Sequence, residues 1–183
     1  NGIIAIKLDK GSPNAPGDEL VWSNLTEGDN DVILTTLDGK AIRFSERSVR
    51  PMGRSTTGVR GIRLKENDRV VGMDVIRKSD SAELLIVMEN GLGKKTKTSE
   101  FRGQSRGGQG VKVAKVTPKT GKVAFAQVIP PNCKNLIITS KKGQVVKLDI
   151  TAVPKRSRNT QGVFLMRFSK SSDHVSSATC IEE

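Results

Sequence analysis

The chain has 183 residues, of which 31 are Lys or Arg and 19 are Asp or Glu, so its net charge at pH 7 is +12. This excess of positive charge favours a polyanionic partner. No run of about 18 apolar residues is present, which excludes a transmembrane helix, and no secretory signal peptide is visible.

A repeat of 52 residues organises most of the sequence. The same step relates three glycines and three Gly-Val pairs, at Gly39, Gly91 and Gly143 and at residues 58–59, 110–111 and 162–163. Three positions are basic in every copy: Arg43, Lys95 and Lys147; Arg54, Arg106 and Arg158; and Arg63, Lys115 and Arg167. A repeated module therefore carries repeated positive charge.

Residues 1–30 look like an incomplete first copy. Gly2–Ile6 corresponds to the Gly-Val segment of the other copies, and Glu19–Leu25 corresponds to their final apolar segment. An insertion in the Gly- and Pro-rich stretch 11–17 explains the longer step to the next copy. The sequence thus starts inside a repeat, and we expect it to be a fragment.

Three full copies follow, at residues 31–82, 83–134 and 135–183. Each contains four short runs rich in Val, Ile, Leu and Thr, which are bounded by turn dipeptides such as Asp-Gly and Asn-Gly. The runs that close the copies are Val70–Ile76, Val123–Ile129 and Val175–Ile181. Side chains alternate along a strand, so Ile42 and Phe44 should face one side and Arg43 the other.

No segment has convincing helical periodicity, and Gly and Pro interrupt every candidate. Four-stranded repeats of this length are typical of the blades of a propeller-like structure. The sequence therefore predicts one all-β, propeller-like region with about three full blades and a partial one. A β-solenoid is the competing fold, but its repeats are usually shorter.

The positive charge belongs to the full copies. Their net charges are +4, +7 and +4, against −3 for residues 1–30. Most surface charge only confers solubility. However, about 0.25 all-basic columns are expected by chance in independent copies of this composition, and three are found. A regular array of cations suits the regularly spaced phosphates of a nucleic acid.

Other functional motifs are weak. The loop Gly103–Gly110 has four glycines and Arg106, which would suit a close approach to phosphate, but it is not a P-loop. Cys133 and Cys180 read as small core residues and His174 as a solvated side chain. No second His is available for a zinc site, so no metal is predicted.

The copies Gly53–Leu64 and Arg158–Val163 resemble blade motifs of the C-terminal domain of the bacterial DNA gyrase A protein. The resemblance implies a β-pinwheel, in which blades exchange a strand with their neighbours, and a basic rim that wraps duplex DNA for strand passage and negative supercoiling. Within the loop at 103–110, the family's signature box is matched by Gln104, Arg106, Gly107, Gly108 and Gly110. Ser105 and Gln109 replace basic residues, so this loop is a degenerate equivalent of the gyrase A box.

The chain contains no tyrosine, the nucleophile of type II topoisomerases, so the resemblance implies a non-catalytic domain. Implied partners are double-stranded DNA, the rest of gyrase A, and gyrase B in a heterotetramer, in the bacterial cytoplasm at the nucleoid. No cofactor is expected here, since ATP and Mg belong to the holoenzyme. The predicted DNA-binding residues are Arg43, Arg50, Arg54, Arg60, Arg63, Lys94, Lys95, Lys97, Arg102, Arg106, Lys112, Lys115, Lys147, Lys155, Arg156, Arg158 and Arg167.

Two alternative functions remain open. The nearer is the corresponding C-terminal domain in topoisomerase IV, in which a degenerate box is expected. The more distant is a protein-interaction propeller of the WD40 type, which would show Gly-His and Trp-Asp signatures in each blade. The sequence has one Trp and one His, which disfavours that class.

Overall fold

The computed structural model describes residues 2–13, 16–77, 81–170 and 172–182. These residues form an all-β structure with three short turns of 3-10 helix, at Glu46–Ser48, Thr98–Glu100 and Ile150–Ala152. The strands are β1 (Asp31–Thr36), β2 (Lys40–Ser45), β3 (Val70–Ile76), β4 (Glu83–Met88), β5 (Leu92–Lys97), β6 (Val111–Lys112), β7 (Val123–Val128), β8 (Asn135–Ser140), β9 (Val145–Asp149), β10 (Val163–Phe164) and β11 (Val175–Ile181).

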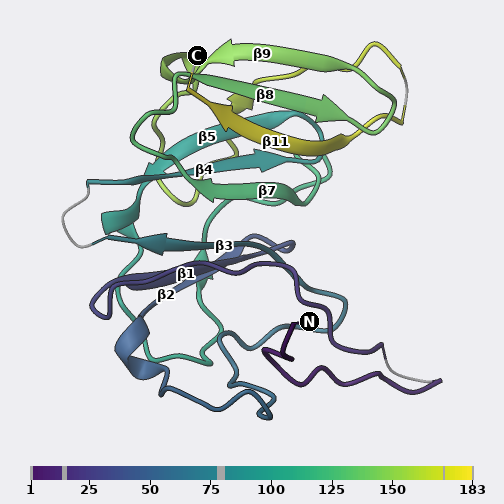
Figure 1. Ribbon diagram of the computed structural model, residues 1–183. Coiled ribbons are helices and arrows are strands. Elements are labelled where there is room, and N and C mark those ends of the chain that lie inside the picture. Colours follow the sequence, from purple (N-terminus) through teal and green to yellow (C-terminus); the bar gives the residue numbers. More distant parts are fainter. Residues whose placement is uncertain (1, 14–15, 78–80, 171, 183) are drawn as a thin grey trace.

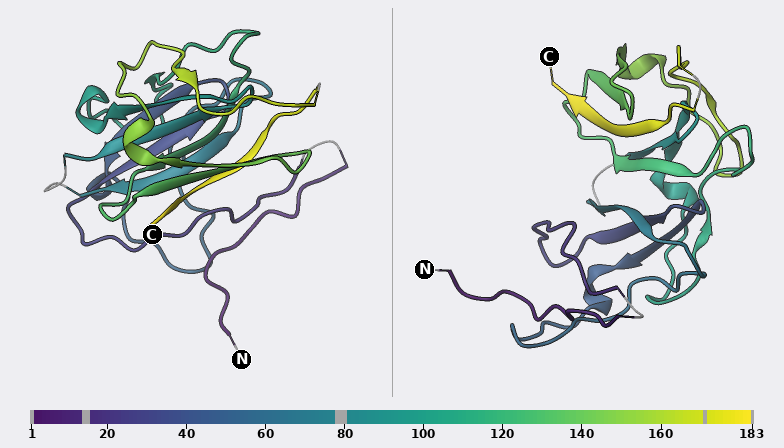
Figure 2. Two further views of the ribbon diagram at one scale, coloured as in Figure 1. Left: turned by 90° about the horizontal axis from the view of Figure 1, so that it is seen from above. Right: turned by 90° about the vertical axis from the view of Figure 1, so that its right-hand side faces the viewer.

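The strands form three antiparallel sheets that stack one on the next (Figure 1). Their strand orders are β3-β1-β2-β6 in blade 1, β10-β5-β4-β7 in blade 2 and β11-β8-β9 in blade 3. Seen from the side, the stack follows an arc (Figure 2). The predicted propeller-like arrangement is therefore confirmed.

Each blade begins with a hairpin whose turn needs a glycine. Gly39, Gly91 and Gly143 have φ of 77°, 81° and 86°, a region that side chains with a Cβ disfavour. Each donates its N–H to the carbonyl three residues earlier, as with Gly39 and Thr36 at 3.0 Å. The 52-residue recurrence of glycine is thus explained by a repeated hairpin turn.

The fourth strand of a blade comes from the next copy. Strand β6, which lies in the second copy, pairs with β2, and β10 of the third copy pairs with β5. Gly110 and Gly162 permit this pairing, since a Cβ on either would lie 2.5 Å from Ala41 O or 2.3 Å from Gly93 O. The strand exchange implied by the family resemblance is present in this chain.

The core lies mainly between blades. Ile33 and Ile76 of blade 1 pack with Leu84, Ile86 and Val123 of blade 2 in one buried cluster. A second cluster joins β4 to the strands of blade 3. Burial of this apolar surface holds neighbouring blades face to face.

The N-terminal copy differs from the expectation. Neither Gly2–Ile6 nor Glu19–Leu25 forms a strand, and both segments are exposed. Among the described residues, no hairpin pairs with either segment. Likewise Val59, unlike Val111 and Val163, is not in a strand, and Gly58 has no atom within 4 Å of its ideal Cβ position.

Candidate nucleic-acid interface

In one of the three basic columns, all three side chains are exposed. Arg63, Lys115 and Arg167 all have exposed side chains, and we call them the rim column. Lys115 and Arg167 each lie three residues after an exchanged strand. The backbone N–H of Arg63 donates to Gly108 O at 2.8 Å, and that of Lys115 donates to Thr160 O at 3.2 Å. Equivalent hydrogen bonds therefore hold Arg63 and Lys115 at equivalent places in successive copies.

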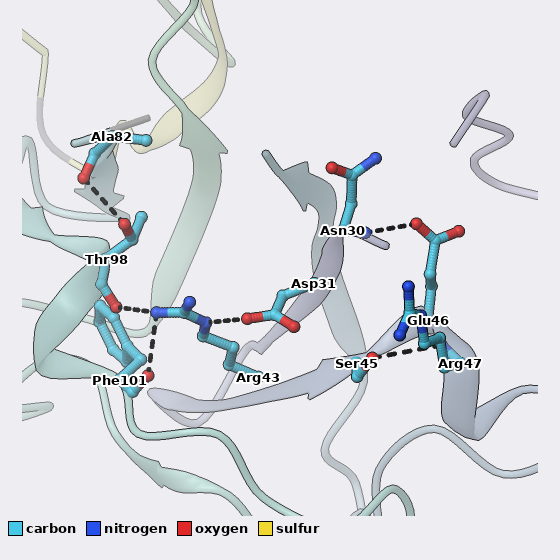
Figure 3. A network of polar contacts seen from close by, with 9 residues as sticks. All are labelled: Asn30, Asp31, Arg43, Ser45, Glu46, Arg47, Ala82, Thr98 and Phe101. Atoms are coloured by element: carbon cyan, nitrogen blue, oxygen red, sulfur yellow. Dashed lines mark hydrogen bonds and ion pairs between the residues drawn. The ribbon is translucent and has the colours of Figure 1, made fainter. Parts of the chain in front are cut away.

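The column of Arg43 is engaged within the protein. Arg43 Nε donates to Asp31 Oδ2 at 2.7 Å, and Nη1 donates to Thr98 O at 3.0 Å in the next copy (Figure 3). Its alternation with the buried Ile42 and Phe44 is as predicted. The half-buried guanidinium thus links the first hairpin to the 3-10 turn of the second copy.

Lys95 repeats this arrangement one blade further on. Its Nζ donates to Ile150 O at 3.0 Å and lies 3.8 Å from Glu83 Oε2. Glu83 and Ile150 are 52 residues after Asp31 and Thr98, so the acid, the cation and the acceptor carbonyl all recur. Lys147, the third member of the column, is exposed.

The second column also reaches between copies. Arg106 Nη1 donates to Arg60 O at 2.9 Å, and its Nε donates to Ser48 O at 3.3 Å. Arg158 Nη1 donates to Lys112 O at 3.0 Å, the carbonyl 52 residues after that of Arg60. Both side chains are half-buried, whereas Arg54 in the same column is exposed. We call Arg43, Lys95, Arg106 and Arg158 the bracing cations.

Lys94 is the most deeply buried of the predicted cations, with 1% of its surface exposed. Its Nζ donates to Ser157 O and Arg158 O, both at 2.7 Å. Burial lowers the pKa of this ammonium to about 8, partly offset by the nearby Glu100 carboxylate. Ile42 and Val146 occupy the same position in the other copies, so this contact belongs to blade 2 alone.

The structure thus divides the predicted DNA-binding residues into two groups. The four bracing cations and Lys94 have their donors directed at protein carbonyls. The remaining side chains are exposed: Arg50, Arg54, Arg60, Arg63, Lys97, Arg102, Lys112, Lys115, Lys147, Lys155, Arg156 and Arg167. Lys155 among them pairs with Glu83 Oε1 at 2.5 Å, and Arg167 lies 4.3 Å from the centre of the Phe164 ring.

The degenerate box lies against blade 1. Gln104 N donates to Arg43 O at 2.8 Å, and Gly107 N donates to Gly61 O at 2.7 Å. Gly107 and Gly110 have positive φ, and a Cβ on Gly108 would lie 3.5 Å from Ile42 Cδ1. In this copy, the glycines let the loop pack on the preceding blade and begin the exchanged strand.

Several acidic partners of these cations and strands were not predicted from the sequence. Asp31 and Glu83 carried a signal, because they are acidic residues 52 positions apart, but Asn135 breaks the column. Asp74 gave no repeat signal, since Ala126 and Ala178 occupy its equivalent positions. Its Oδ2 accepts from Val128 N at 2.8 Å across the blade 1–blade 2 contact, and burial raises the pKa of this carboxyl to about 6.

His174 and the cysteines lie in the body of the protein. The expectation of a solvated His174 is wrong, because the ring is half-buried with Nδ1 3.2 Å from Asn90 Oδ1. Cys133 is buried and Cys180 half-buried, and burial beside Cys133 raises the pKa of the Cys180 thiol to about 12. The described residues contain no cluster of three metal-ligating side chains. Among them, no helix is long and apolar enough to cross a membrane.

Stacked antiparallel blades that exchange a strand, with exposed cations repeated from copy to copy, define the class of strand-exchanged β-propellers. A family model described as "DNA gyrase C-terminal domain, beta-propeller" matches residues 30–77, 82–130 and 134–182. The chain therefore belongs to the DNA gyrase C-terminal domain family, the C-terminal β-pinwheel of a type IIA topoisomerase.

Individual relatives agree with this assignment. The DNA gyrase A protein of Staphylococcus epidermidis is 38% identical over 91% of this chain, as is that of Staphylococcus aureus. The chain spans 18% of the length of these relatives. Among solved structures, a DNA gyrase A C-terminal domain has a TM-score of 0.76 and 27% identity, covering 98% of this chain and 58% of its own.

The C-terminal domain of a DNA topoisomerase IV is similar in fold, with a TM-score of 0.78 at 24% identity over 87% of this chain and 49% of that one. The E. coli ParC C-terminal domain has a TM-score of 0.69 at 20% identity, over 96% of this chain and 69% of that one. The two subfamilies share the blade architecture, and the curated sequence relatives reported above are gyrase A proteins.

Proposed function

We propose that this chain binds duplex DNA along its exposed cations and bends it around the stacked blades, as the DNA-wrapping part of a gyrase A protein. The observation that carries the proposal is the rim column, in which Arg63, Lys115 and Arg167 are exposed on three successive copies and equivalent backbone hydrogen bonds hold the first two. DNA is stiff over about 150 base pairs, so a short site bends only if regular contacts offset the elastic cost.

Within the parent protein, this domain is non-catalytic. The chain lacks the tyrosine that DNA cleavage requires in type II topoisomerases. Cleavage, ATP hydrolysis and Mg²⁺ binding then belong to the remainder of gyrase A and to gyrase B, which are its proposed partners in a heterotetramer. The proposed setting is the bacterial cytoplasm, at the nucleoid. The single domain, residues 1–183, supplies the path on which DNA is presented for strand passage.

Duplex is the favoured form of the ligand. Single-strand binders stack bases on aromatic side chains, whereas aromatic residues make up 3% of this chain. The exposed cations can contact phosphates without reading sequence, because phosphate contacts position a duplex but carry no base information directly. We therefore expect binding with little dependence on sequence.

The test is the affinity for a duplex as a function of salt concentration. With about eight phosphates contacted, log K should fall with log salt at a slope near −7. Ligation of a nicked circle in the presence of this chain or of the full-length parent protein would score the topological change per bound protein. No binding at low salt, or a slope near zero, would contradict the proposal. Capture of a protein partner without any DNA shift would instead support an interaction propeller.

A further inference from the structure

We propose that Arg43, Lys95, Arg106 and Arg158 are positioning residues, which fix the rotation between consecutive blades and so the curvature of the bound duplex, without contacting phosphate themselves. The inference rests on the proposed DNA-wrapping function. It separates cations that face the ligand from cations that arrange the surface on which the ligand lies.

Each bracing cation crosses from one copy to the next. Arg43 and Lys95 each pair with an acid in their own hairpin and donate to a carbonyl in the 3-10 turn of the next copy. Arg106 and Arg158 reach back to the carbonyls of Arg60 and Lys112. The contacts of Arg43 with Asp31 and Thr98 and of Arg106 with Arg60 each have an equivalent 52 residues further on, so the same placement of neighbouring copies is imposed twice.

The contacts of Arg106 and Arg158 with the preceding copy lie next to exposed cations of the proposed DNA-binding surface. The carbonyls that accept from Arg106 and Arg158 belong to Arg60 and Lys112, whose own side chains are exposed cations. Three residues later come Arg63 and Lys115 of the rim column. Each of these two braces therefore fixes the backbone that carries the exposed charges of the preceding copy.

Apolar packing alone would leave this rotation less determined. The clusters between blades bury Ile, Leu, Val and Met side chains, and the hydrophobic effect is not directional. Hydrogen bonds from a guanidinium or ammonium depend on angle and distance, so they select one rotation among those that packing allows. An error in the rotation between each pair of neighbouring blades would accumulate along the stack. The exposed cations of the last blade would then be displaced from the phosphates they should contact.

Phosphate would compete poorly for these donors. Arg43 and Lys95 have side chains that are 22% and 13% exposed. Turning Arg43 toward DNA would take the hydrogen-bonded cation away from the half-buried Asp31 carboxylate, and turning Lys95 would remove one of the two cations beside Glu83, which is unfavourable in a poorly solvated setting. The protein contacts are therefore retained when DNA binds, and these residues add little to the count of phosphate contacts.

The repeat supplies matched controls for an experiment on the full-length parent protein. Lys95→Met removes the ammonium and keeps the apolar stem, and Lys95→Arg restores a donor of the kind present at Arg43. Lys147→Met is the control, because Lys147 is in the same column but exposed. Two quantities are measured for each: the salt slope of duplex binding, and the linking-number change per bound protein on ligation of a nicked circle.

We expect Lys95→Met to leave the salt slope unchanged and to reduce the linking-number change by about twofold or more. Lys95→Arg should restore it. Lys147→Met should instead make the slope shallower by at most about 0.9, the value for one phosphate. A Lys95→Met slope shallower by that amount would show direct phosphate contact and overturn the inference. The inference would also be overturned if Lys95→Met gave the same linking-number change per bound protein as the unaltered protein.

A second pair of variants provides a check in case Lys95→Met, which alters strand β5, fails to fold. Arg106→Gln is compared with Arg54→Gln, which lies in the same column but is exposed. The expected split is the same: altered topology at constant slope for Arg106→Gln, and an altered slope for Arg54→Gln if that side chain meets phosphate. If the unaltered protein fails to bind duplex at all, the proposed function fails, and that result is distinct from every variant outcome above.

Discussion

The rim column is best tested by removing all three of its charges. The triple variant Arg63→Gln, Lys115→Gln and Arg167→Gln keeps polar, solvated side chains at exposed positions, so the fold should be little affected. If each cation neutralises one phosphate, the slope of log K against log salt becomes shallower by about 2.7. At 0.1 M salt this is a loss of affinity of about 500-fold, which disappears toward 1 M salt.

The assay is equilibrium binding of a fluorescent duplex at a series of salt concentrations. A control triple with the same change in net charge is Lys7→Gln, Lys134→Gln and Lys141→Gln, all exposed and outside the predicted interface. Charges beyond about 10 Å from DNA are largely screened at 0.1 M salt, so the control slope should change by much less. Equal losses in the two triples would refute a localised interface and leave only a net-charge effect.

Two further predictions concern the fold that supports this surface. Asp74 has its pKa raised from 3.8 to about 6, so the native state binds its proton more tightly than the unfolded chain does, and stability falls as pH rises through this range. Asp74→Asn keeps an acceptor for Val128 N–H, so it should raise the free energy of unfolding at pH 7 by up to about 3 kcal/mol. Urea denaturation should show this gain shrinking as pH falls and vanishing below the unfolded pKa of 3.8. A gain of the same size at that low pH would contradict the explanation. Gly162→Ala should destabilise the protein more than Gly58→Ala, because both positions have φ of 82° but only at Gly162 would the new Cβ meet a backbone oxygen, 2.3 Å away. The Gly58 change should cost about 1 kcal/mol from its backbone conformation alone, and equal losses in thermal denaturation would argue against close packing of the exchanged strand.

The repeat made most of the fold predictable. Hairpin glycines and Gly-Val pairs recur at one spacing, and closing strands recur within one residue of it, so local turn and strand chemistry could be assigned three times over. Val175–Ile181 is confirmed residue for residue as β11, and the predicted Val123–Ile129 is one residue longer than β7. The expected strands in residues 1–30 are wrong, because strand pairing depends on a partner that periodicity alone does not reveal.

The chemistry of the cations was less predictable. A column of Arg and Lys gives the same sequence signal whether it meets phosphate or a neighbouring carbonyl. Arg43 and Arg63 are both basic in every copy, yet one donates to Asp31 and Thr98 and the other is exposed. The distinction depends on where each residue lies, Arg43 within β2 and Arg63 in the segment before β3, and on contacts 46 to 58 residues away in the chain. Such long-range contacts carry no local pattern.

Because of strand exchange, the 52-residue copy in the sequence and the blade in the structure do not contain the same residues. A cut between the second and third copies, at the boundary near residue 134, would remove β10 and leave the N–H and C=O groups of β5 without their partner. An uncovered strand edge of this kind invites pairing with other chains and aggregation. Duplication of one 52-residue copy, by contrast, supplies a new acceptor edge together with a new donor strand. A chain built this way can be lengthened by whole copies more safely than it can be trimmed.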